Sequence, residues 1–175
     1  MANSSHLARR FVGSLRPGGP SLSDRQWAER QLLDSERVIW CSLSGPDRRH
    51  SAAVARRVEQ RLGSEASRPI LAAALLHDCG KLHSGLRTPG RVVATVIAAT
   101  IMTTPEAVAE WAQSSSSAKR AIGRYRSHPE LGAADLMKAG SDPLTVVWTK
   151  EHHLPSSQWT LEPNVAAALY EADDD

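Results

Sequence analysis

The sequence predicts an all-α domain built as a helical bundle. Nearly every segment places its apolar residues at the spacing of one helix face, and most segments open with a capping residue followed by proline or an acidic residue. The connections between segments are short. The run Arg91 to Ile101 is rich in β-branched residues and could form a strand, but no other segment offers it a strand partner. We therefore expect a helix there too.

Length and composition predict a single soluble domain. With 175 residues, 41% of them apolar, the chain is long enough to bury a substantial core. A net charge of +2 is too close to balance to indicate nucleic acid or an anionic membrane as a partner. No segment has the pattern of a signal peptide, and the apolar run Val92 to Met102 is shorter than the roughly 18 residues that cross a bilayer. We expect a cytoplasmic protein, and the sequence indicates no oligomeric state.

The two cysteines, Cys41 and Cys79, are too few for a disulfide framework and are expected to be reduced thiols. Nothing in the sequence offers Cys79 an activating base, so we do not expect it to act as a nucleophile. The five tryptophans are expected in the core.

The N-terminal part is predicted to be a surface segment followed by two short helices. Residues 1–22 mix Gly, Pro and Ser and are expected to be flexible, which leaves residues 23–175 as the domain. A helix start at Ser23-Asp24 and apolar stripes over 27–33 and 38–43 predict two helices that cover a core.

Two longer helices follow, and each carries polar groups on a buried face. The first starts at Ser44 to Asp47 and runs to about Leu62, with His50 on the same face as its apolar residues. The second spans Ser67 to Cys79, with Gly80 just past its end. Its apolar run leads directly into His77 and Asp78, so both side chains are expected in the interior, where they need partners.

The second half of the chain shows further helix starts. One lies at Thr104 to Glu106, and a short helix over 118–125 follows a serine linker. The next helix starts at His128 and ends at Gly140, and another runs from Ser141-Asp142-Pro143 to His152-His153.

The last helix starts at Glu162-Pro163 and ends in three aspartates. Asp173 shares the face of Val165 and Leu169, whereas Asp174 does not. A carboxylate that points inward from an apolar stripe is unusual and needs a partner.

Seven polar groups thus lie at helix caps or on buried faces: His50, His77, Asp78, His128, His152, His153 and Asp173. Imidazole and carboxylate together suit zinc or another first-row divalent ion. A single tetrahedral site uses about four ligands, so seven groups suit two adjacent ions.

The order of these groups resembles that of the HD superfamily of metal-dependent phosphohydrolases, and the resemblance covers about residues 47–173. The matching segments are Arg49-His50-Ser51, His77-Asp78-Cys79-Gly80-Lys81 in place of the family's His-Asp-Ile-Gly-Lys, His128-Pro129-Glu130-Leu131-Gly132-Ala133, Glu151-His152-His153 and Ala172-Asp173. The resemblance implies a helical bundle with the metal site in its core.

The resemblance also implies how the site is arranged. One divalent ion would be held by His50, His77, Asp78 and Asp173. Asp78 would bridge to a second ion held by His128 and His152, while His153 would bind that ion or contact the substrate. The metal would be Mn, Fe, Co, Zn or Mg. Lys81 would lie beside the ions and neutralise phosphate charge, and Arg124 or Arg126 could reach the same phosphate.

The implied activity is hydrolysis of a phosphate ester, of a nucleotide or another small phosphorylated metabolite, by a metal-bound or bridging hydroxide. Two alternatives remain open: a regulatory module that binds a nucleotide with little turnover, and a mixed-valent di-iron oxygenase. After His153 the chain reads Leu-Pro-Ser-Ser and lacks the Gly-Tyr-Pro motif of the family's cyclic-dinucleotide branch. The segment between Asp78 and His128 is long for the family.

Overall fold

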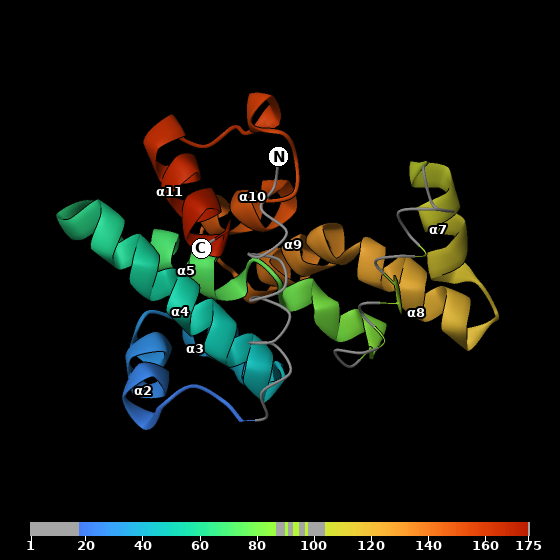
Figure 1. Ribbon diagram of the computed structural model, residues 1–175, viewed down its shortest axis with the longest axis horizontal. Coiled ribbons are helices and arrows are strands. Elements are labelled where there is room, and N and C mark those ends of the chain that lie inside the picture. The colour runs from blue at the N-terminus through green and yellow to red at the C-terminus, as the bar shows by residue number, and fades with distance from the viewer. Residues whose placement is uncertain (1–17, 87–89, 91–92, 95–96, 98–103, 175) are drawn as a thin grey trace.

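The computed structural model is a bundle of α-helices (Figure 1). It describes residues 18–86, 90, 93, 94, 97 and 104–174, and none of these residues lies in a β-strand, so the predicted all-α class is confirmed. The described helices are α2 (Leu22–Arg30), α3 (Asp34–Ser42), α4 (Gly45–Leu62), α5 (Arg68–Leu76), α7 (Pro105–Gln113), α8 (Ser117–Arg126), α9 (His128–Ala139), α10 (Pro143–Glu151) and α11 (Pro163–Asp174), together with the short 3-10 helices η1 (Gly63–Glu65), η2 (Cys79–Ser84) and η3 (Ser156–Gln158).

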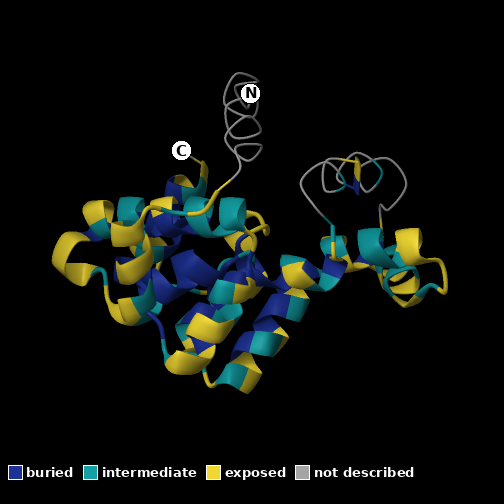
Figure 2. Ribbon diagram, turned by 90° about the horizontal axis from the view of Figure 1, so that it is seen from below, coloured by how far each residue is buried: buried dark blue, intermediate teal, exposed yellow. Residues whose placement is uncertain are grey.

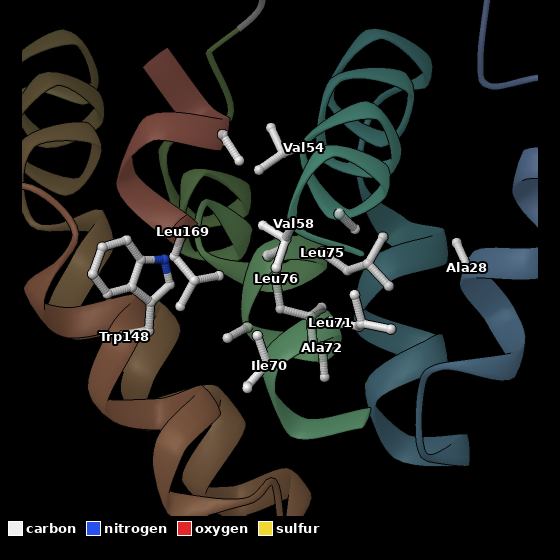
Figure 3. Packing of buried hydrophobic residues seen from close by; sticks show 14 of the residues in the cluster. Ala28, Val54, Val58, Ile70, Leu71, Ala72, Leu75, Leu76, Trp148 and Leu169 are labelled. Carbon is white, nitrogen blue, oxygen red and sulfur yellow. The ribbon is translucent and has the colours of Figure 1, made fainter. Parts of the chain in front are cut away.

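The apolar helix α5 lies at the centre of the bundle. All of its residues from Ile70 to Leu76 are buried, because α4, α10 and α11 pack around it. Figure 3 shows side chains from these helices gathered about α5. Truncating a leucine such as Leu76 to alanine at a site of this kind costs roughly 2–5 kcal/mol of stability. The chain that follows α5 is therefore anchored deep in the interior.

Most of the predicted helix starts are confirmed. The side chains of Ser44, Thr104 and Asp142 accept hydrogen bonds from backbone N–H groups in the first turns of α4, α7 and α10, as N-cap residues do. Proline lies in the first turn of each of these helices. Helix α2 begins slightly earlier than predicted, because Ser21 is its cap and not Ser23.

Two predicted helix ends were wrong. Helix α5 stops at Leu76 and not at Cys79, since Asp78 leaves the helical conformation (φ −101°, ψ 7°) and the chain turns into η2. Helix α10 stops at Glu151 and not at His153. In both places the histidines and the aspartate lie at or just past a helix end, where the chain turns.

Helices α7 and α8 form a hairpin that projects from the body of the bundle (Figures 1 and 2). The two helices pack closely at Gly123, where an added Cβ atom would lie only 2.2 Å from the backbone nitrogen of Ala112. Helix α8 also packs against η2. Of the helix predicted over 91–101, the structure describes only 93, 94 and 97, all helical; its other residues lie outside the described part.

The expectation for the tryptophans held for three of the five. Trp27, Trp40 and Trp148 are buried in the core, whereas Trp111 and Trp159 are only half-buried. The half-buried pair lies at the edges of the bundle's packing: one is on the projecting hairpin, and the other is on the connection between α10 and α11.

The predicted N-terminal segment lies mostly outside the described residues, which begin at Gly18. The backbone carbonyl of Gly18 accepts a hydrogen bond from Arg49 at 2.7 Å, so residues at the end of that segment lie on the start of α4. Among the helices that the structure describes, none combines the length and the apolar character that a bilayer span requires.

Candidate metal centre

The fold brings the seven predicted ligands together from five parts of the chain, in two sets. Within each set the potential ligand atoms all lie within 4.8 Å of one another. The first group consists of His50 on α4, His77 after α5 and Asp173 on α11. The second group consists of Asp78 after α5, His128 at the start of α9, and His152 and His153 after α10.

The first group is centred on Asp173. Its Oδ1 atom lies 2.9 Å from His50 Nε2 and 3.6 Å from His77 Nε2. Asp173 is half-buried while its neighbour Asp174 is exposed, which confirms that the former faces inward. Asp173 faces inward because Leu169, which the sequence predicted to share its face, is buried in the core together with Ala172 of the same helix.

Asp78 belongs to the second group, but one of its oxygens also lies near the first. Its Oδ2 atom is 3.4 Å from His77 Nε2 of the first group. Its Oδ1 atom is 3.2 Å from His128 Nε2 and 3.6 Å from His152 Nε2. The two oxygens of Asp78 therefore face histidines of different groups.

Backbone carbonyl groups hold three of the imidazoles in one tautomer. The Nδ1 atoms of His77, His128 and His152 lie 2.9, 2.7 and 2.9 Å from the carbonyl oxygens of Ala74, Tyr125 and Thr149. A carbonyl oxygen can only accept, so each Nδ1 must carry the proton and donate it. When the ring is neutral, the lone pair of each Nε2 therefore points into the cluster, as in histidines that bind metal.

These atoms fit a divalent cation. The Nε2 atoms of His77, His128 and His152 and the Oδ1 atom of Asp78 are buried, and none of them forms a hydrogen bond with a described residue. Buried polar groups without partners are rare and costly. Two ligands that each lie about 2.1 Å from one ion are roughly 3.0–3.4 Å apart, close to the separations found around Asp78.

The charges within the cluster shift several pKa values. Burial favours the neutral imidazole, but the carboxylates of Asp78 and Asp173 raise the pKa of His77 to about 9. Burial also opposes ionisation of Asp78, yet Lys81 and His77 hold its pKa well below the usual range. Burial lowers the pKa of His128, which keeps that ring neutral and available as a ligand. Near neutral pH the metal-free cluster thus contains an anionic Asp78, a protonated His77 and a neutral His128.

Comparison with protein-family models, with curated proteins and with solved structures finds no match to this chain.

Lys81 lies at the cluster, as the resemblance to the HD superfamily implied. Its Nζ atom pairs with Asp78 Oδ2, so a cation borders the proposed bridge. Cys79 is buried, and burial raises its pKa to about 12, which agrees with the expectation that it is no nucleophile. Arg124 and Arg126 are exposed in the last turn of α8, and their contact with a phosphate stays a prediction.

Sequence reasoning missed the packing that assembles the site. Gly80 was expected to end a helix, but a Cβ atom on it would lie 1.9 Å from the carbonyl oxygen of His128. Its role is therefore close contact between η2 and α9. At the other end of η2, His83 contacts Asp135 of α9 at 2.6 Å. Gly80 and Gly132 stand in the two motifs that the sequence singled out, but the sequence alone does not show that their backbones meet.

Proposed function

We propose that the protein is a metal-dependent phosphohydrolase of the HD type, which cleaves a phosphate ester of a nucleotide or another small phosphorylated metabolite. One observation carries this proposal: three buried imidazoles, each fixed in the tautomer that binds metal, surround a carboxylate whose two oxygens face two separate sets of donors. The order of these residues along the chain, which resembles that of the HD superfamily, supports the same conclusion.

The two groups would each hold one ion, with Asp78 contributing an oxygen to both. Such a pair of ions, when bound, supplies Lewis-acid stabilisation of phosphate oxygens and lowers the pKa of a coordinated water. The chain's contribution is to fix the donors before the substrate arrives. Because the carbonyl groups of α5, α8 and α10 already orient the rings, little reorganisation is needed.

The position of the more exposed residues indicates where a substrate enters. His50 of the first group and His153 of the second are the most exposed donors of their groups. The buried donors His77, His128 and His152 form the inner side of the site. A phosphate that arrives from the exposed side would meet the ammonium group of Lys81, which borders the same carboxylate. Lys81 would then balance the negative charge that grows on the phosphoryl oxygens during cleavage.

The proposal is tested by metal analysis of the purified protein and by phosphate release. The metal-free protein is loaded with Mn, Co, Fe or Mg, and release of phosphate is measured over a panel of nucleotides and small phosphate esters. We expect metal-dependent release that is lost on adding a chelator and lost in Asp78→Ala. Asp174→Ala, which alters an exposed neighbour of a ligand, should behave like the wild type.

The same panel separates the alternatives. Tight nucleotide binding without turnover under any metal would replace the hydrolase by a regulatory binding module. A product that forms only with dioxygen and an iron-loaded protein would favour an oxygenase.

A further inference from the structure

The last residue of α10 is a buried glutamate that the proposed chemistry does not use. Both carboxylate oxygens of Glu151 bond to Thr160: Oε2 accepts from the backbone N–H at 2.8 Å, and Oε1 accepts from the hydroxyl at 2.8 Å. A buried carboxylate is costly unless such donors satisfy it. Glu151 therefore acts as a two-point latch between the end of α10 and a residue nine positions further along.

The segment enclosed by this latch is packed at other points as well. Trp159 donates a hydrogen bond from Nε1 to the carbonyl of Leu154 at 3.1 Å. Its ring lies 5.6 Å from the ring of Trp148 on α10 and 5.2 Å from that of Tyr170 on α11. The chain between α10 and α11 is thus held against both helices.

Two donors of the second group depend on this turn. His152 is the C-cap of α10, and His153 lies beyond the helix. Beyond His152 the backbone hydrogen bonds of α10 no longer hold the chain. Further along, the chain is held by the bond from Leu154 N–H to the Glu151 carbonyl at 2.8 Å, by the contacts of Trp159 and by the latch itself. The first group lies on other parts of the chain, on α4, directly after α5 and on α11.

We propose that Glu151 is a positioning residue for the second group: by holding Thr160 it fixes the turn that places His152 and His153 at their ion. The inference rests on the proposed function only in taking the second group to bind a divalent ion. It assigns to Glu151 a selective effect on that ion and none on the ion of the first group.

Three substitutions test the latch. Glu151→Gln keeps the size of the side chain but removes its charge and one acceptor oxygen, so the two charge-assisted bonds are replaced by weaker neutral ones. Thr160→Val keeps the shape and the backbone N–H but removes the hydroxyl. Thr160→Ser keeps both donors and is the matched control.

The readout is calorimetric titration of the metal-free full chain with Mn²⁺. We expect Glu151→Gln and Thr160→Val to weaken one of two binding steps by about tenfold, at the lower end of the effect of groups that support metal ligands. The other step should not change, and Thr160→Ser should match the wild type. If Glu151→Gln does not yield folded protein, Thr160→Val gives the same comparison.

Ligand variants assign the affected step. The effect of Glu151→Gln should persist in a His50→Ala background, which disables the first group, and disappear in His152→Ala. Equal weakening of both steps, or a lower melting temperature with both affinities intact, would overturn the inference, as would a wild type that binds no ion at the second group. A wild type that binds two ions and hydrolyses no ester defeats the proposed function but leaves this inference standing.

Discussion

A Cβ atom on Gly80 would lie 1.9 Å from the carbonyl oxygen of His128, so the turn after Asp78 and the start of α9 meet backbone to backbone. The contact is reciprocal, since a Cβ atom on Gly132 would lie 2.9 Å from the backbone nitrogen of Gly80. This approach accompanies the 3.2 Å separation of His128 Nε2 and Asp78 Oδ1. Two residues without side chains therefore help to join the two halves of the second group.

Replacing Gly80 by alanine should push α9 away from η2. Because the obstructing atoms are backbone, they cannot move aside cheaply, and we expect a loss of roughly 1–3 kcal/mol of stability. The second group should lose affinity for its ion, since His128 moves with α9. Thermal unfolding and a Mn²⁺ titration measure the two effects.

Gly19→Ala is the matched control. A Cβ atom there meets no atom closer than 3.9 Å and Gly19 does not have a positive φ, so its stability and metal binding should be those of the wild type. A Gly80→Ala protein that binds metal normally would contradict the role given to the contact.

Removing the carboxylate of Asp78 should lower the affinity for both ions, whereas removing that of Asp173 should lower the affinity for one ion. The reason is that the oxygens of Asp78 face different groups, while Asp173 contacts His50 and His77 of the first group. Metal content and stepwise affinity of the two alanine variants measure this. Equal stoichiometry in the two variants would show that Asp78 is no bridge.

Metal uptake by the first group should release a proton. Although burial favours its neutral form, the ring of His77 carries a proton up to about pH 9 because of Asp78 and Asp173. An ion must displace that proton, so near neutral pH we expect release of about one proton, with affinity that rises as the pH approaches 9. Binding heats in buffers of different ionisation enthalpy count the protons, and heats independent of buffer would refute the prediction.

The same proton links the stability of the metal-free protein to pH. A pKa raised from 6.5 to about 9 means that protonated His77 stabilises the fold fully below pH 6.5, and that this contribution is lost as the pH rises through 9. In the presence of a chelator, stability should fall over that interval by on the order of 1–3 kcal/mol. His77→Gln should remove this part of the pH dependence.

Lys81→Met should reduce turnover while leaving both ions in place. The substitution keeps the aliphatic stem but removes the ammonium group beside Asp78, and loss of one such electrostatic contact costs roughly 10²–10³ in kcat. Lys138→Met changes an exposed lysine on α9 and should be neutral. Turnover that is unchanged in Lys81→Met would remove Lys81 from the proposed chemistry.

The sequence determined the helices, their buried faces and the identity of the candidate donors. Caps such as Ser44 and Thr104, and faces such as the one shared by Leu169 and Asp173, depend on residues a few positions apart, so they can be deduced from local spacing. The chemical type of the donors, imidazole and carboxylate, likewise needed no coordinates to indicate a divalent ion.

Only the tertiary structure decided how those donors are held. The resemblance implied two groups joined by Asp78, but the carbonyl groups that fix the rings and the latch from Glu151 to Thr160 depend on where chain segments turn and meet. Gly80 and His128 are far apart in sequence, and their contact produces no periodic pattern of residues that could be recognised in the sequence. Local pattern encodes the faces of helices, whereas the approach of two backbones is settled by packing of the whole chain.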